Sequence, residues 1–281
     1  MAQAPRADCI MMLTLGPSAF AFDAIAREFD SRFSAWESVA AQRRAVRAAL
    51  LSAFPAAGRI LELGGGTGED AAFLAARGFQ VVLTDASPTM VGLAQAKLAP
   101  LGGQAQLAAL EELEKFAARQ ISSGCEMFDG AFSNFAPLNC VMDLDPVARG
   151  LAQLLKPGAR TMLVLFGTFC PGEMVTELVR GRPEIVFRRF RRKPMAARVA
   201  GREFQVVYHR RAALIRSFAP WFVLESRQGI GITVPPSAAE PWITQHPRLL
   251  AGMEKFDRAL SRPLAMLGDH VLYQFRRTEA Q

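Results

Sequence analysis

The chain has 281 residues, of which 51% are hydrophobic and 21% are charged, so it can bury a large core and does not resemble a disordered chain. Its net charge of +7 leaves nucleic acid, a membrane surface or an anionic substrate open as partners. The cysteines lie far apart without a C-x-x-C pair, which argues against a disulfide framework and against zinc; they are Cys9, Cys125, Cys140 and Cys170. We therefore expect a cytoplasmic protein without a metal site.

The N-terminal region combines an apolar run with an aromatic helix. The run CIMMLTLGPSAFAF is broken by Gly16 and Pro17 and is too short to span a bilayer. It also lacks the basic start and the cleavage site of a signal peptide, so we expect a loose arm. In AFAFDAIAREFDSRFSAW, residues at helical spacings form one apolar stripe: Phe22, Ile25, Phe29, Phe33 and Trp36.

From about residue 54 to residue 166, short apolar runs alternate with helical segments. This alternation predicts parallel strands that are joined by right-handed crossovers. Strands buried on both faces should be continuous apolar runs, as these are. The strands are expected at 60–63, 81–85, 104–108, 127–132 and 161–166, the helices at 67–77, from Ser87 onward and at 143–155, and two further strands at 221–227 and 270–276. The fold class is therefore a doubly wound, mostly parallel α/β sheet of seven strands.

The stretch RILELGGGTGED, residues 59–70, carries the strongest signal for a ligand. Glycines after the first strand let backbone N–H groups approach a ligand closely. Asp85 ends the second strand, where a carboxylate can accept hydrogen bonds from ribose hydroxyls. The glycines follow G-x-G-x-G and not the dinucleotide pattern G-x-G-x-x-G, and Glu62 would repel a pyrophosphate. We therefore predict a nucleoside cofactor that carries a positive charge.

These motifs resemble those of the class I S-adenosylmethionine-dependent methyltransferases. ELGGGTG resembles the family's first motif, TDAS followed by Met90 its second, FDGAFSN the segment around the fourth strand, and LKPGARTMLVLF the turn before the fifth. The four matches occur in the family's order and spacing between residues 59 and 166. The chain departs from the family after the third strand, where Ala109 and Leu110 replace the usual acid.

The resemblance implies S-adenosylmethionine as the cofactor and S-adenosylhomocysteine as its product. Asp85 would bind the ribose, Met90 would pack against the adenine, and Ser133 would lie near the sulfonium. The full set of cofactor residues that the resemblance implies is Glu62, Gly64, Gly65, Gly66, Gly68, Asp85, Ala86, Met90, Leu110, Glu111 and Ser133.

The resemblance also divides the chain into three parts. Residues 1–52 would form an N-terminal arm and a helical lid, residues 53–167 the cofactor-binding core, and residues 168–281 the substrate cap with the last two strands. The lid has Phe29 where many small-molecule methyltransferases have a tyrosine. The long segments 168–208 and 232–268 should build the substrate site. Its candidate residues are Phe29, Phe33, Asn134, Asn139, Tyr208 and His209.

No obligatory catalytic motif is expected, because an electrophilic methyl group needs mainly an aligned nucleophile and the exclusion of water. His209 is the best candidate for a general base, whereas His270, in the last predicted strand, is expected to be structural. The run FRRFRRK, residues 187–193, is either a solvated helix face or a device that steers an anionic acceptor inward.

The leading hypothesis is an enzyme of the EC 2.1.1 type that methylates a small organic acceptor. The acceptor could be anionic, quinone-like or a natural product, and the enzyme is expected to be a monomer or homodimer. The alternatives are an RNA methyltransferase, which only the basic charge favours, and a non-catalytic protein that binds S-adenosylmethionine. A nicotinamide oxidoreductase is disfavoured by Glu62 and by the glycine spacing. We expect neither a nucleic-acid partner nor a membrane span.

Overall fold

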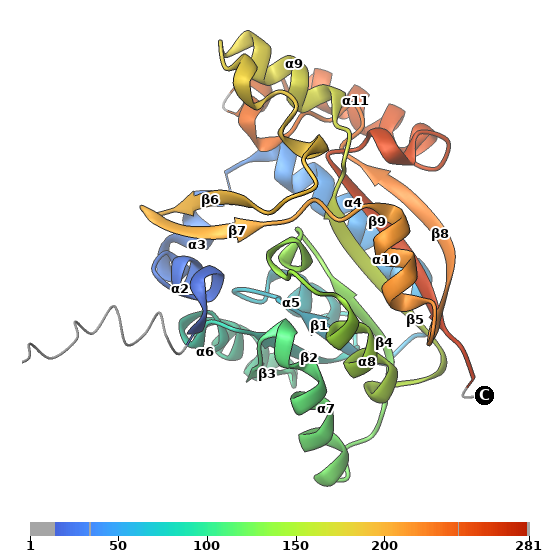
Figure 1. Cartoon of the computed structure of the whole chain (residues 1–281). Coiled ribbons are helices and arrows are strands. Elements are labelled where there is room, and N and C mark those ends of the chain that lie inside the picture. Colours follow the sequence, from blue (N-terminus) through green and yellow to red (C-terminus); the bar gives the residue numbers. More distant parts are fainter. Residues whose placement is uncertain (1–14, 34, 241, 280–281) are drawn as a thin grey trace, which may run out of the picture.

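The computed structural model describes residues 15–33, 35–240 and 242–279. The predicted loose arm lies largely outside these residues. The predicted aromatic helix is two short helices, α2 (Pro17–Asp23) and α3 (Ala26–Phe33), and α4 (Glu37–Ala53) follows them. Figure 1 shows α2 and α3 beside the sheet, beneath a long hairpin.

The centre of the molecule is a seven-stranded sheet in the order β3-β2-β1-β4-β5-β9-β8. The first five strands run parallel to their neighbours, and β9 is antiparallel to both β5 and β8. This arrangement confirms the predicted fold class. The strands are β1 (Arg59–Leu63), β2 (Gln80–Asp85), β3 (Gln104–Leu107), β4 (Phe128–Ser133), β5 (Leu155–Phe166), β8 (Phe222–Ile230) and β9 (His270–Arg277).

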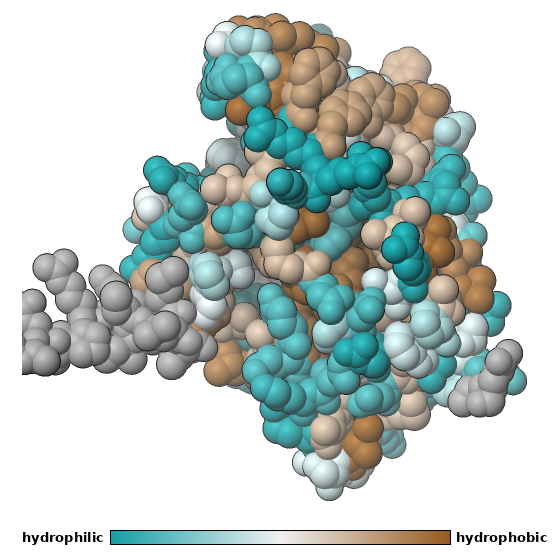
Figure 2. All heavy atoms as spheres, viewed as in Figure 1, coloured by the Kyte–Doolittle hydropathy of each residue, from teal (hydrophilic) through white to brown (hydrophobic). Residues whose placement is uncertain are grey.

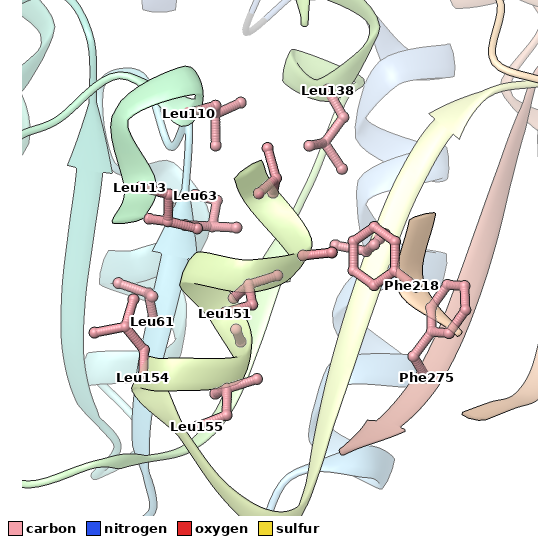
Figure 3. Close-up of a cluster of buried hydrophobic side chains, with 14 of the residues drawn as sticks. Leu61, Leu63, Leu110, Leu113, Leu138, Leu151, Leu154, Leu155, Phe218 and Phe275 are labelled. Atoms are coloured by element: carbon pink, nitrogen blue, oxygen red, sulfur yellow. The ribbon is translucent and has the colours of Figure 1, made fainter. Parts of the chain in front are cut away.

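Helices cover both faces of the sheet because successive residues of the buried strands are apolar on either side. In β1, Ile60 packs into one core and Leu61 into the other. On the first face lie α4, α5 (Glu69–Ala75) and α6 (Pro88–Leu98), and on the second lie α7 (Leu113–Ser122), α8 (Asp145–Leu154) and α10 (Arg211–Phe218). Figure 3 shows part of the second core, where Leu61, Leu63 and Leu113 gather on one side and Phe218 lies beside Phe275 on the other.

The fifth strand begins earlier than predicted. Leu155 pairs with Phe128 before the Pro-Gly turn, and the register shifts between Phe128 and Gly130. Gly158, with φ of 79°, forms the bend at this irregularity. The predicted turn is therefore a distortion inside β5 and not a break before it.

The two long segments after β5 form the upper part of the molecule in Figure 1. The first contains α9 (Pro171–Val179), the 3-10 turns η4 (Pro183–Ile185) and η5 (Arg188–Phe190), and the antiparallel hairpin of β6 (Met195–Val199) and β7 (Arg202–Val206). The second contains η6 (Ser237–Ala239), η7 (Ile243–Gln245), α11 (Pro247–Leu260) and η8 (Ala265–Leu267). Figure 2 shows hydrophobic side chains gathered at the top, over α9, where Val175, Leu178 and Val179 are exposed.

Within the described ranges, no helix has the length and apolar character needed to cross a membrane.

Candidate active site

The glycine turn after β1 leaves no room for side chains at two of its positions. A Cβ on Gly64 would lie 2.5 Å from the Cβ of Pro137, and one on Gly65 would lie 2.4 Å from Cδ1 of Leu83. Gly64 and Gly66 also have positive φ, 61° and 55°, which favours glycine. At Gly66, by contrast, a Cβ would meet nothing nearer than the Met90 sulfur at 4.0 Å, so this part of the turn has an open side. Gly68, with φ of 81°, then begins α5.

Asp85 connects this turn to the start of α6. Its Oδ2 accepts a hydrogen bond from the Gly66 N–H at 2.9 Å, and its Oδ1 accepts one from the Ser87 N–H at 2.9 Å. Burial raises the pKa of Asp85, although the N–H groups of Ser87 and Gly66 oppose the rise. Each carboxylate oxygen can accept more than one hydrogen bond, so acceptor capacity remains for two ribose hydroxyls.

Two residues of the second motif lie next to Asp85. Ala86 is partly exposed beside it, and Met90 is buried beneath Gly66, with its N–H donating to the Ser87 hydroxyl at 3.1 Å. Ser87 therefore caps α6 as its position before Pro88 predicts.

Glu62 lies buried under the glycine turn. Its carboxyl carbon is 2.7 Å from where a Cβ of Gly65 would stand, and its Oε2 has no hydrogen-bond partner within the described part of the chain. Burial raises the pKa of Glu62 well above its usual value, and the nearby Asp70 adds to the rise. A cationic group at this turn would lower that pKa again, whereas a pyrophosphate would raise it further. The electrostatics therefore agree with the predicted class of cofactor.

The segment after β4 crosses in front of the glycine turn in a strained conformation. Ser133 is buried and donates its hydroxyl to the Leu63 carbonyl at 3.0 Å. Phe135 and Ala136 have positive φ, 54° and 66°, which costs about 1–3 kcal/mol for a residue with a side chain. The neighbouring Asn134 donates to Asp70 Oδ2 at 2.7 Å, so its amide belongs to the group of charges beneath the turn.

Leu110 and Glu111 lie at the other edge of the turn, in η2 (Leu110–Glu112). Leu110 is buried, with its Cδ1 3.9 Å from the Cβ position of Gly64, and Figure 3 shows it opposite Leu138. Glu111 is exposed and close enough to Cys140 to add to the effect of burial, which raises the pKa of that thiol to about 12. Cys140 is therefore protonated at neutral pH and is no nucleophile.

The N-terminal helices attach to the cofactor side of the sheet through two aspartates that sequence reasoning did not single out. Asp23 of α2 accepts hydrogen bonds from the Thr89 N–H at 3.0 Å and from the Ser87 hydroxyl. Asp30 of α3 accepts from the Thr67 hydroxyl and from Lys97 Nζ at 2.6 Å. The recurrence of F-D seven residues apart is a signal for this pair, because residues seven apart would share one face of a continuous helix. In the structure the two aspartates lie on separate helices, α2 and α3.

Aromatic side chains continue from these helices to the cap. Phe29 lies between Phe22, which it meets edge-on, and Phe33, whose ring is tilted against it, with ring centroids 6.5 Å and 4.7 Å away; all three side chains are partly buried. Phe22 also contacts Phe204 of the hairpin at 5.4 Å. On the other side of the hairpin, Tyr208 lies 5.9 Å from Phe166, the last residue of β5. The carboxyl ends of the central strands are therefore covered by an aromatic lining.

Two of the predicted substrate residues have other roles. Asn139 is completely buried: its Nδ2 donates to the Val207 carbonyl at 2.6 Å, and its Oδ1 accepts from the Phe166 N–H at 3.0 Å. His209 contacts the carbonyls of Val141 and Leu138 through Nε2 at 2.9 Å and 3.2 Å. Because a carbonyl only accepts hydrogen bonds, Nε2 must carry a proton and donate it. His209 therefore holds residues 138–141 in place, and its Nε2 is not available as a base.

The arginine run is divided between the interior and the surface. Arg189 is buried, 7% exposed, and its guanidinium binds Glu173 and, at 2.6 Å, Asp269 Oδ1; Arg188 also pairs with Glu173. Cys170, Glu173 and Asp269 converge as metal ligands would, but the guanidinium already neutralises both carboxylates. Steering of an anionic acceptor would thus fall to the exposed Arg191, Arg192 and Lys193.

The fold and these motifs agree with comparisons to known proteins. Residues 60–158 match a family model described as a methyltransferase domain. An S-adenosylmethionine-dependent methyltransferase from Mesorhizobium loti is 19% identical, with a TM-score of 0.50 over 82% of this chain and 96% of that one. The methyltransferase CcbJ from Streptomyces caelestis is 16% identical, with a TM-score of 0.53 over 83% and 89%. Among curated proteins, none matches the chain.

A third solved structure, a complex of DhpI with S-adenosylhomocysteine, is 16% identical, with a TM-score of 0.53 over 95% of this chain and 98% of that one. In the present structure, the open side of Gly66, the acceptor capacity of Asp85 and the Glu62 Oε2 atom, which has no hydrogen-bond partner among the described residues, fit a cationic nucleoside. Residues 60–158 therefore form a methyltransferase domain, and the chain has the fold of the class I S-adenosylmethionine-dependent methyltransferases. The residues of the site fit S-adenosylmethionine as cofactor and S-adenosylhomocysteine as product.

Proposed function

We propose that the protein methylates a small organic acceptor enclosed beneath the cap. The observation that carries the proposal is the aromatic lining over the carboxyl ends of β4 and β5, where Phe22, Phe204, Phe166 and Tyr208 come from three separate segments. A lining of this kind suits the apolar body of a small molecule, with a few polar groups to orient it.

S-adenosylmethionine supplies an electrophilic methyl group when it is bound. The residues of this chain would do the rest: Asp85 and the glycine turn hold the cofactor, and the lining orients the acceptor for in-line attack and keeps water out. Orientation of this kind can contribute about 7–11 kcal/mol to lowering the barrier. We retain Phe29, Phe33 and Tyr208 as proposed acceptor contacts. We withdraw Asn134, Asn139 and His209, whose polar groups bind other parts of the protein.

The division of labour that we infer follows the three parts of the sequence. Residues 1–52 would cover the site as a lid, residues 53–167 would bind the cofactor, and residues 168–281 would shape the acceptor site. Arg188 and Arg189 pair with Glu173, so these two arginines of the run are less available to bind RNA. We infer a cytoplasmic enzyme that acts as a monomer or homodimer; the free thiols of Cys125, Cys140 and Cys170 suit a reducing compartment.

The test is transfer of a labelled methyl group from S-adenosylmethionine to a metabolite extract, followed by mass spectrometry of the small-molecule and RNA fractions. We expect label in the small-molecule fraction, and less of it with the Asp85→Ala variant. Label confined to RNA would replace this function with the alternative one. Binding of S-adenosylhomocysteine with no labelled product in either fraction would indicate a non-catalytic protein.

A further inference from the structure

We propose that His270 is the general base of the methyl transfer, and that the acceptor is therefore an oxygen or nitrogen that carries a proton. The inference rests on the proposed function and adds the chemical class of the acceptor. His270 is the first residue of β9 and pairs with Phe166, the last residue of β5, so it stands at the edge of the sheet where ligands bind. The sequence had suggested a structural role for it.

The imidazole of His270 faces the region where the acceptor would lie. Its ring stacks on Phe166, with centroids 4.9 Å apart, and meets the edge of Phe135 at 5.8 Å. Phe166 belongs to the aromatic lining, and Phe135 belongs to the strained turn in front of the cofactor site. The ring therefore lies between the two parts of the site that methyl transfer must bring together.

The neighbours of His270 determine which ring nitrogen carries the proton. The Asp269 carboxylate can only accept hydrogen bonds. The amide atom of Gln42 that lies 3.2 Å from Asp269 Oδ2 must therefore be the nitrogen, Nε2, which donates. The Gln42 Oε1 then faces Nδ1 of His270 at 3.1 Å and requires a proton on it. In the neutral ring, Nε2 is left with a free lone pair, and within the described residues it has no hydrogen-bond partner. That is the tautomer a base needs.

The groups that fix this tautomer are themselves held rigidly. Arg189 binds Asp269 at both the side chain and the carbonyl, each at 2.6 Å. Glycines surround the contact: a Cβ on Gly231 would lie 2.6 Å from Gln42 Nε2, and one on Gly167 would lie 2.2 Å from the Gly268 carbonyl oxygen. The Gly231 backbone therefore lies directly against the Gln42 amide, where a side chain would collide with it.

The other polar groups near the lining are less suited to this role. His209 donates its Nε2 proton to backbone carbonyls, as described above. Burial raises the pKa of Tyr208, so its phenol stays protonated at neutral pH. The charged groups around the His270 ring are Asp269 beside it, Arg189 and Glu173 from the cap, and Arg43 of α4 on the ring of Phe135.

In the proposed step, the methyl group moves to the acceptor and the acceptor's proton moves to His270. The acceptor's oxygen or nitrogen forms a bond to the methyl carbon, and the electron pair of the breaking S–C bond passes to sulfur, which becomes a neutral thioether. The acceptor's proton passes to Nε2 of His270, and the resulting imidazolium is stabilised through Nδ1 by Gln42 and the Asp269 carboxylate. General-base catalysis of this kind typically contributes about 10²–10⁴-fold to the rate.

The first test needs no acceptor. We would label the full-length protein with 15N-histidine, add S-adenosylhomocysteine and record the imidazole nitrogens by NMR at neutral pH. The chain has three histidines, so the His270→Asn and His246→Gln variants assign the signals by difference. We expect a protonated Nδ1 and an unprotonated Nε2 for His270. A proton on Nε2 with a bare Nδ1 would overturn the inference.

The second test uses the acceptor that metabolite labelling identifies. His270→Asn should lower kcat/KM by about 10²–10⁴-fold and abolish the fall of the rate toward low pH, with S-adenosylhomocysteine affinity unchanged. His246→Gln, at an exposed site, should behave as wild type. If His270→Asn keeps the wild-type rate and pH profile, His270 is not the general base, whereas the proposed function stands. If the wild type methylates nothing, the proposed function itself is wrong.

Discussion

Asp85 shows how one side chain can link a turn, a helix start and a ligand. Its two oxygens hold the Gly66 and Ser87 N–H groups and still have acceptor capacity directed outward. We expect Asp85→Ala to weaken S-adenosylhomocysteine binding by roughly ten- to a hundred-fold, because hydrogen bonds to a charged group contribute about 1.5–3 kcal/mol. Titration calorimetry measures this loss.

The matched control is Asp143→Ala, which removes an exposed aspartate that only its own loop contacts, at the Asp145 N–H. It should bind the product with wild-type affinity. Circular dichroism would show whether each variant is folded. A folded Asp85→Ala protein with unchanged affinity would mean that Asp85 only shapes the turn and does not contact the ribose.

At the scale of single residues, the sequence is informative about the cofactor half of the site and much less about the acceptor half. Glycines and Asp85 belong to short local motifs, so their positions could be predicted. His270 could not be recognised as a base, because its tautomer depends on Gln42, 228 residues away in the chain. The roles of Asn139 and His209 could not be predicted for the same reason. Their hydrogen-bond partners come from segments that no local pattern connects to them.

At the scale of elements, α2 packs apolar side chains against the hairpin, and both α2 and α3 contact the cofactor side of the sheet through polar side chains. Asp23 and Asp30 bind the loop and helix starts that surround the cofactor site, and Asp30 shares Lys97 with Glu69. The ion pairs of Lys97 are partly exposed, and such pairs contribute only about 0–1 kcal/mol each. Because these polar contacts surround the cofactor site, we expect cofactor binding to change the mobility of both helices.

We predict that α2 and α3 become more protected when the product binds. Hydrogen exchange with and without S-adenosylhomocysteine measures the protection of both helices. Helix α11, in the second long segment after β5, serves as the internal reference. The change should be smaller in a variant with Asp23→Ala and Asp30→Ala. Equal protection of α2 and α3 in both states would show that they are fixed packing helices and do not act as a lid.

The elements themselves were largely predictable because each strand of the core is a continuous apolar run and α6 has a clear cap. The exceptions have physical causes. β5 starts early because its pairing with Phe128 precedes the bend at Gly158. The arginine run does not form a helix face. Its residues 188–190 form a 3-10 turn, and the Arg189 side chain points into the protein and pairs with Asp269.

At the scale of the whole molecule, the buried Arg189 ties the cap to the sheet, and this contact should make stability depend on pH. Burial alone would raise the pKa of Asp269, but His270 and Arg189 hold it well below its usual range. A depressed pKa stabilises the fold above the unfolded-state value, near 4, and the contribution is lost as the pH falls below it. The loss should therefore begin below about pH 4.

Urea unfolding between pH 3 and pH 7 tests this contribution. The wild type should lose stability below about pH 4 more steeply than Asp269→Asn. At pH 7, Arg189→Met should lower the free energy of unfolding by about 3–5 kcal/mol, since it removes the buried cation that pairs with both Glu173 and Asp269. Arg191→Met, on the surface, should change it little. Equal effects of the two arginine substitutions would mean that the buried contact does not stabilise the cap.

The position of β9 also has a consequence for how the chain is made. β9 lies between β5 and β8 in the sheet, although it is synthesised after both. Until it emerges from the ribosome, β5 presents an open hydrogen-bonding edge, and β8 has no neighbour in the sheet. Open edges are prone to pairing with other chains. The nascent protein could thus complete its cofactor-binding half early and still depend on its last strand, or on a chaperone, to avoid aggregation.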